Sequence, residues 1–457
     1  MIHRHWYTCI VAFLLYAFTH TVMAQQKVLS IYFIGDAGEP SLPENGLKSS
    51  ILAHYDSSVR ASFVFLGDNI YPKGLPPKND PDRELADFML KAQVDLATAF
   101  SGMAYFVPGN HDWHRDGKHG WERIILQQQW IDSLKNPLVR FLPKGGCPGP
   151  VAVTLGTDVV MIVIDSQWFL HPWDKPRGED SPCEMKQPED VALQLQELLE
   201  RHKGKRIIVA AHHPIFTYGE HGGSFTLKDH LFPLTAFDSS NLYIPMPIIG
   251  SVYPLYRKLI GSRQDVAHPL NKQYRNLIRN VLEQHTGIVY ANGHEHTLQY
   301  SVKDSIHYVT SGSSVKVRHV RKKGYAQFVS AQLGYVRMDV FGDGTAALLY
   351  FEVLKEKPVF QVSLKAPEQQ VASADEVIPP TGHFVKVHAS DRYTRKRTSR
   401  WLGENYRMEW KQDLDVPVFD LSGWKIVQKG GGMQTLSLRL EDSVGNQFTL
   451  RSVEKYP

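Results

Sequence analysis

Side chains that can bind metal ions recur in five short segments of the sequence, each directly after an apolar run. They are GD at Asp36, GDNIY at Asp68 and Tyr71, GNHD at Asn110 and His111, AHHP at His212, and GHEH at His294 and His296. Without thiolate, this mixture of oxygen and nitrogen donors suits iron, zinc or manganese. Seven ligands exceed what one tetrahedral zinc accepts, so the set indicates two metals that share a bridging carboxylate, for which Asp68 is the candidate.

Tyr71 is the most informative member of this set. A phenolate is a hard anionic donor, so Tyr71 favours a trivalent ion such as ferric iron. Taken singly, the residues have simpler explanations: GD is a common turn, Asn110 could cap a helix, His294 could be a surface histidine, and Tyr71 could pack its ring at a strand end. The metal-site prediction therefore depends on the recurrence at successive strand ends.

The elements that must position these residues follow an α/β pattern. Short apolar runs at 27–34, 62–66, 103–107, 159–164, 206–211 and 287–291 read as strands buried on both faces. Amphipathic helices are expected at 82–100, 188–205 and 271–287, and a hairpin with a GDG turn at 336–353. Sites form at the carboxyl ends of strands in such sheets, so the side chains should converge although they span much of the sequence.

The chain is expected to divide into four parts. Residues 1–24 have the basic start, short apolar run and small Ala24 of a cleaved signal peptide; a membrane anchor is the competing interpretation, for which the run is short. Residues 27–355 would form the catalytic domain, 356–382 a linker, and 383–457 a small β-rich module of unknown role. The basic run 392–400 in that module reads as a solvated strand or loop, or as a contact with an anionic surface.

Export would leave Cys147 and Cys183 as a pair in an oxidising compartment, where a disulfide is expected and two free thiols are the alternative. No cysteine spacing suggests a zinc finger. Lysine and arginine (51) barely outnumber aspartate and glutamate (47), and this net charge is too small to indicate nucleic acid or another polyanion as a partner, so no nucleic-acid scaffold role is expected. The oligomeric state is not predicted.

The ordered motifs GDAG, GDNIY, GNHD, AHHP and GHEH resemble the calcineurin-like metallophosphoesterase superfamily. Within this superfamily, the tyrosine of GDNIY and the segment AHHPIFTYGEHGG resemble the purple acid phosphatase branch, and specifically its small, tartrate-resistant members of the mammalian type. The resemblance covers about residues 27–353 and implies a four-layer α/β/β/α sandwich.

The same resemblance implies ligand assignments. Fe(III) would be held by Asp36, Asp68, Tyr71 and His296, and a divalent iron, zinc or manganese ion by Asp68, Asn110, His212 and His294. His213 would lie behind the ligands. His111 and His221 are implied as catalytic groups that protonate the leaving group or orient the phosphate.

The expected activity is that of an exported dimetal acid phosphatase, which hydrolyses small-molecule or protein phosphomonoesters by attack of a metal-bound hydroxide. A metallophosphodiesterase acting on nucleotides or lipid head groups is the alternative. A non-enzymatic relative would be expected to have lost ligands, and none is missing. No transmembrane helix is expected in the mature chain, whose destination is the periplasm, the cell surface or the medium.

Three features depart from the small family members. Two insertions, HRDGKHGWER and FLHPWDKPRGEDSPCEM, could reshape substrate access, with His114, His119 and Trp168 as candidate contributors. A third, about residues 228–269, contains the apolar stretch IPMPIIGSVYPLY, which could form a lid, a partner surface or additional core. The C-terminal module has no counterpart in those members.

Overall fold

The computed structural model describes residues 26–236 and 243–368, together with the backbone of strands between Phe384 and Arg451. By its contacts the chain separates into two units, residues 1–369 and 370–457. The predicted signal peptide lies outside the described residues, and the domain boundaries expected from the sequence stay predictions. No helix within the described ranges has the length and apolar character needed to cross a bilayer.

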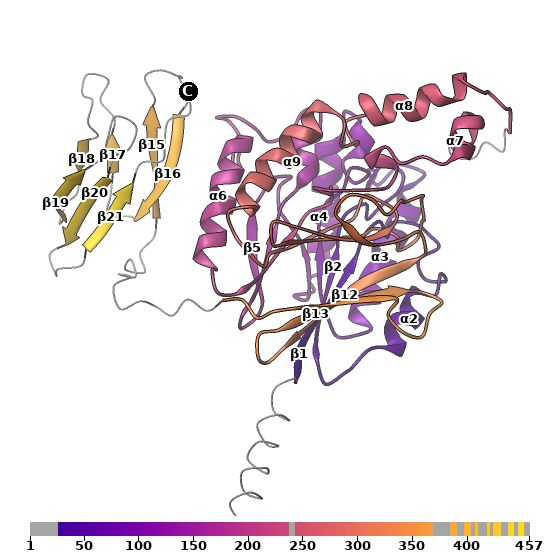
Figure 1. Cartoon of the computed structure of the whole chain (residues 1–457), viewed down its shortest axis with the longest axis horizontal. Coiled ribbons are helices and arrows are strands. Elements are labelled where there is room, and N and C mark those ends of the chain that lie inside the picture. The colour runs from indigo at the N-terminus through magenta and orange to yellow at the C-terminus, as the bar shows by residue number, and fades with distance from the viewer. Residues whose placement is uncertain are drawn as a thin grey trace, which may run out of the picture. The chain divides into compact units, whose positions relative to one another are not determined.

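The first unit contains two seven-stranded mixed sheets (Figure 1). Sheet A has the order β14 (Phe360–Leu364), β13 (Ala346–Glu352), β12 (Gly334–Phe341), β1 (Lys27–Ile34), β2 (Arg60–Phe65), β3 (Met103–Phe106) and β4 (Val139–Phe141). Sheet B has the order β11 (Ala326–Ser330), β9 (Leu298–Lys303), β10 (Ile306–Ser311), β8 (Val289–Asn292), β7 (Arg206–Ala210), β6 (Val159–Val163) and β5 (Val151–Gly156).

Strand β1 shows why its sequence, KVLSIYFI, is almost wholly apolar. Leu29, Ile31 and Phe33 pack into the core between the two sheets, whereas Tyr32 and Ile34 point the other way, into the core under the helices of sheet A. Successive side chains of a strand face opposite sides, so a strand buried on both faces is apolar at most positions; the buried Ser30 is the exception and donates its hydroxyl to Asp339.

Helices cover the outer face of each sheet. The core outside sheet A receives side chains from α2 (Leu47–Ala53), α3 (Arg83–Thr98) and α4 (Gly120–Ser133). The core outside sheet B receives them from α6 (Pro188–Arg201) and α9 (Pro269–Leu282), with the short α5 (Ser166–Leu170) beside α9. The layers are therefore helices, sheet, sheet and helices, which confirms the predicted sandwich.

Most of the predicted elements are confirmed within a few residues. The expected helices correspond to α3, α6 and α9, and the GDG hairpin is β12 and β13, paired in antiparallel register. In the second unit, which was expected to be rich in β-structure, β20 (Ser437–Asp442) and β21 (Gln447–Arg451) form an antiparallel pair. The predicted disulfide between Cys147 and Cys183 is present. Strands β4, β5, β9, β10, β11 and β14 were not predicted.

Candidate metal centre

The predicted ligands follow strands that are neighbours in the two sheets. In sheet A, β1, β2 and β3 run parallel, so Asp36, Asp68 and Asn110 leave it at one edge. In sheet B, β7 and β8 run parallel and deliver His212 and the His294–His296 segment in the same way. The two edges meet, and all seven predicted side chains form one contacting set.

Three residues of this set have a left-handed backbone: Asp36 (φ 58°), Asp68 (φ 54°) and His294 (φ 69°). Such conformations are costly for residues other than glycine and concentrate at functional sites. The neighbouring Gly67 also has positive φ, and a Cβ there would lie 2.4 Å from His212 Nδ1. The tight turn after β2 therefore requires glycine both for its conformation and for the approach of the histidine ring.

The first group of donors surrounds the Tyr71 hydroxyl. Its oxygen lies 3.1 Å from Asp36 Oδ1, 3.1 Å from Asp68 Oδ2 and 3.1 Å from His296 Nε2. His296 Nε2 and Asp36 Oδ1 are 3.5 Å apart. These are the residues that the resemblance assigns to the ferric ion.

The second group surrounds the Asn110 side-chain oxygen. Asn110 Oδ1 lies 2.9 Å from His212 Nε2 and 3.0 Å from His294 Nδ1, and the two ring nitrogens are 3.2 Å apart. These are the residues assigned to the divalent ion.

Asp68 lies between the groups. Its Oδ2 faces Tyr71, and its Oδ1 lies 3.4 Å from His212 Nε2 while accepting a hydrogen bond from the backbone N–H of His111. The carboxylate thus presents one oxygen to each group, an arrangement that would allow it to bridge two metals.

Hydrogen bonds on the far side of the two rings test whether this set fits a metal. His212 Nδ1 lies 2.8 Å from the Leu66 carbonyl, and His294 Nε2 lies 3.0 Å from the Gln264 carbonyl. Because a carbonyl can only accept, these nitrogens carry the protons, and in neutral rings the opposite nitrogens present lone pairs. Two lone pairs and an amide oxygen then face one another at about 3 Å without a proton between them, an arrangement that a cation would stabilise.

Burial and the crowding of anionic groups disfavour the charged forms of Asp36 and Tyr71, a cost that a bound cation would offset. Burial, with the Asp68 carboxylate adding to it, raises the pKa of Asp36 well above its ordinary value. Burial and the Asp36 and Asp68 carboxylates raise the pKa of Tyr71 in the same way. The side chains fit a dimetal site, and the identity of the metals is not determined by them.

His111 and His221, the predicted catalytic groups, border the two donor groups. The His111 ring packs edge-on against Tyr71, its Nδ1 donates to the Pro72 carbonyl, and its Nε2 is 3.8 Å from Asp68 Oδ2. The His221 ring lies 4.0 Å from the His294 ring, and its Nδ1 bonds to Asp265 Oδ1 at 2.8 Å.

One ring nitrogen of His213 lies within 4.8 Å of ring nitrogens of His212 and His294, close enough for the three to surround a cation. Both of its ring nitrogens are nevertheless engaged, one with Ser166 Oγ at 2.8 Å and the other with Gln264 Oε1 at 2.6 Å. Since neither nitrogen is left for a metal, we place His213 behind the ligands, as the resemblance implied.

Three supporting residues were missed from the sequence. Asp112, the last residue of GNHD, is fully buried and accepts hydrogen bonds from the backbone N–H groups of Asn69, Ile70 and Gly109, which joins the turns after β2 and β3. The other two, Gln264 and Asp265, lie in the third insertion. Asp112 could have been found from its place in the motif, whereas no sequence signal connects residues 264 and 265 with the site.

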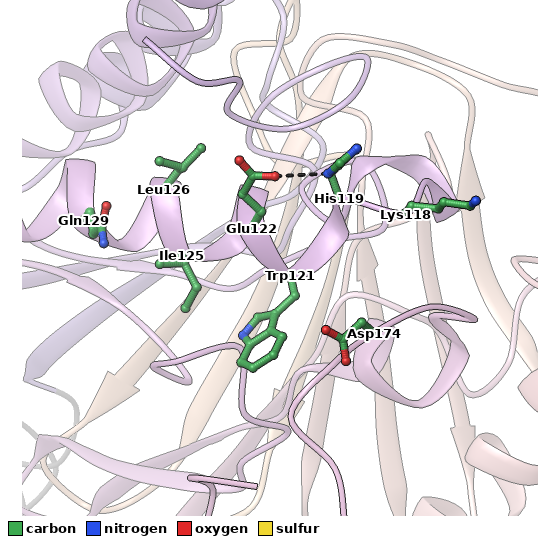
Figure 2. Close-up of a pocket in the computed structure, with 8 residues that line it drawn as sticks. All are labelled: Lys118, His119, Trp121, Glu122, Ile125, Leu126, Gln129 and Asp174. Atoms are coloured by element: carbon green, nitrogen blue, oxygen red, sulfur yellow. Dashed lines mark hydrogen bonds and ion pairs between the residues drawn. The ribbon is translucent and has the colours of Figure 1, made fainter.

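Two of the candidate contributors from the first two insertions, Trp168 and His119, make hydrogen bonds to residues other than the predicted ligands. Trp168 is buried and donates its indole N–H to the Pro176 carbonyl. His119 pairs with Glu122 at the rim of a surface hollow of about 430 Å³, which Figure 2 shows along α4. None of the predicted metal ligands lines that hollow.

Comparisons with known proteins identify the family. Residues 29–298 match the calcineurin-like phosphoesterase family. Purple acid phosphatases 7 and 4 of Arabidopsis thaliana are each 24% identical over 47% of this chain, covering 62% and 60% of their lengths. This chain thus spans about three fifths of the curated relatives that it matches.

Among solved structures, a purple acid phosphatase from yellow lupin seeds matches at 13% identity and a TM-score of 0.42, covering 75% of this chain and 55% of that one. GAP50, described as the anchor in the inner membrane complex of Plasmodium, matches at 16% identity and a TM-score of 0.46, covering 76% and 91%. Since the family match spans more than half of the sequence, the chain belongs to the calcineurin-like phosphoesterase family.

Proposed function

We propose that this protein is an exported dimetal acid phosphatase that hydrolyses phosphomonoesters. The observation that carries the proposal is the position of Asp68, with one carboxylate oxygen toward Tyr71 and the other toward His212. A carboxylate between two complete donor groups is the arrangement expected for two neighbouring metals.

Asp36, Tyr71 and His296 would hold a ferric ion with Asp68, and Asn110, His212 and His294 a divalent iron, zinc or manganese ion. When bound, the metals would lower the pKa of a coordinated water and neutralise charge on the phosphoryl group. The protein's own part is to fix the ligands. The Leu66 and Gln264 carbonyls select the tautomers of His212 and His294, and the buried Asp112 holds two ligand-bearing turns together.

His221 is assigned to the leaving group. Its Nδ1 is engaged by Asp265, which leaves Nε2 to donate a proton to the departing alkoxide. His111 is anchored to the Pro72 carbonyl beside Asp68 and is assigned to orient the phosphate. Both roles are proposals from the placement of the rings.

Export is supported by the amino-terminal sequence and by the disulfide. A structural disulfide between Cys147 and Cys183 is typical of oxidising compartments. We retain 383–457 as an additional module and cleavage near Ala24, but extend the proposed catalytic domain from residue 355 to about residue 364, because β14 pairs with β13 in sheet A. Small-molecule or protein phosphate esters are the proposed substrates, and the same donor set would also permit phosphodiester hydrolysis, which is the alternative.

The test is hydrolysis of an aryl phosphomonoester and of the matching diester by one purified batch, from acidic to alkaline pH. The proposal predicts preference for the monoester with an acidic optimum. Preference for the diester at neutral or alkaline pH would favour the alternative, and no hydrolysis of either by metal-loaded protein would overturn both.

Asp68→Asn tests the metal assignment in the same assay. Bound metal per chain should fall for both ions and turnover should drop at least about a hundredfold, because loss of a residue that only supports a ligand already costs about 10–100-fold. Asp343→Asn, in an exposed turn between β12 and β13, is the matched control and should retain both. Circular dichroism distinguishes loss of metal from loss of fold.

A further inference from the structure

Helix α8 (Val252–Leu259) and the residues before it expose an apolar stripe to solvent. The stripe comprises Ile248, Ile249, Val252, Leu255, Tyr256 and Leu259, which are exposed by 46–89%. Their spacing is that of one face of a helix, the pattern that normally faces a protein core. Here the opposite face is turned inward, since Pro254 is buried and Arg257 pairs with the buried Asp265.

The stripe belongs to a folded segment. The Met246 N–H donates to the Leu231 carbonyl at the end of α7 (Leu227–Leu231), and the Gly250 N–H donates to the Met246 carbonyl. A Cβ at position 250 would lie 2.2 Å from the His230 carbonyl oxygen, so close packing holds this turn against α7. Figure 1 shows α7 and α8 projecting from the margin of the first unit.

Basic side chains border the stripe. Lys258 on α8 lines a hollow of about 380 Å³ together with Leu255 and the exposed Arg321, Lys322 and Lys323; we call these four basic residues the basic rim. Because all four residues line the same hollow, their positive charges lie close together.

Acidic groups in the described part of residues 226–265 do not offset the basic rim. Asp229, which belongs to the capping box of α7, lies next to the exposed Lys228, and Asp265 is buried and paired with Arg257, so cations other than the basic rim balance both carboxylates. The outward face of this segment is therefore apolar and positively charged.

We propose that the apolar stripe and the basic rim dock the protein on an anionic lipid bilayer. An apolar helix face bordered by lysine and arginine can bury its apolar side chains at the headgroup boundary while the cations contact lipid phosphates or carboxylates. A second copy of this chain fits less well, because a two-fold contact through the same patch would bring two basic rims together. The docking does not depend on the proposed phosphatase activity.

The experiment is co-sedimentation of the full chain with vesicles. One set contains phosphatidylcholine alone, and the other contains phosphatidylcholine and phosphatidylglycerol in equal parts. Binding is expected to the anionic vesicles, to be weaker on the neutral ones, and to decrease as salt screens the charge contribution.

Paired variants separate the two parts of the surface. Ile249→Ser/Leu259→Ser, which removes apolar contacts, and Lys322→Glu/Lys323→Glu, which reverses two charges, should each weaken binding at least about tenfold. Leu354→Ser, at a residue 93% exposed in the turn after β13, is the matched apolar control and should bind as the unmodified chain does. Circular dichroism should be the same for all four proteins, since the changed side chains are exposed.

Three results would overturn the proposal. The first is absence of binding to anionic vesicles, and the second is binding that neither double variant reduces. The third is concentration-dependent self-association in the absence of lipid that the apolar double variant abolishes, since a second copy would then occupy the stripe.

Discussion

Replacing Asp265 by alanine should destabilise the protein by about 3–5 kcal/mol, because it would leave the Arg257 guanidinium in a largely buried site without its counterion. Asp265 is fully buried and accepts hydrogen bonds from Arg257 Nε and Nη2, each at 2.6 Å, from His221 Nδ1 at 2.8 Å, and from Ser262. Burial alone would raise the pKa of Asp265, but these donors outweigh it and hold the pKa well below its ordinary value.

The assay is urea unfolding of the metal-loaded chain, with the free energy of unfolding taken from the midpoint and slope. Asp95→Ala is the control, because Asp95 pairs with Lys91 on the exposed face of α3, where both side chains are more than half exposed. Loss of an exposed pair costs at most about 1 kcal/mol.

A double variant tests the cause. Arg257→Met/Asp265→Leu removes both charges, and we expect it to recover most of the stability lost in Asp265→Ala, since apolar replacement of a whole buried pair is often neutral. An Asp265→Ala variant as stable as the Asp95→Ala control, or a double variant less stable than Asp265→Ala, would refute the reasoning.

Three further outcomes are expected. Burial raises the pKa of Asp165 to about 7 from its ordinary 3.8, so the native state holds a proton that the unfolded chain releases, and stability should fall between about pH 4 and 7. As the pH rises from about 4 to 7, the melting temperature of the Asp165→Asn variant should increase relative to that of the unmodified chain. A difference in melting temperature that stays constant over this pH range would contradict the prediction. Replacing both Cys147 and Cys183 by serine removes a disulfide between residues 36 positions apart and should lower the free energy of unfolding, measured with urea, by about 2–4 kcal/mol. An unchanged free energy of unfolding would show that the disulfide does not stabilise the protein. Tyr71→Phe should abolish the visible tyrosinate–iron absorption of the metal-loaded protein. The control Tyr308→Phe should keep this absorption, since it removes a buried hydroxyl that has no hydrogen-bond partner in the described part of the chain. Unchanged absorption in Tyr71→Phe would show that Tyr71 is not a metal ligand.

The metal donors were predictable because they are attached to strong local signals. A strand such as β1 is buried on both faces and therefore reads as a continuous apolar run, and the first polar residue after it marks the strand end. The rule that parallel strands deliver their carboxyl ends to one edge then suffices to bring Asp36, Asp68 and Asn110 together. Strands β5 and β11 were harder to predict because their partly exposed residues give no continuous apolar run.

What the sequence by itself determined is the chemistry of the site: which donor types follow which strands, and hence a mixed oxygen and nitrogen set for two metals. Only the tertiary structure decided which nitrogen of each histidine faces the cluster, because the Leu66 and Gln264 carbonyls that select the tautomers come from distant segments. Only the tertiary structure shows that Asp265 hydrogen-bonds His221, 44 positions away, and that the apolar face of α8 is exposed to solvent. Local periodicity reports that a face is apolar, and long-range packing determines whether that face is covered.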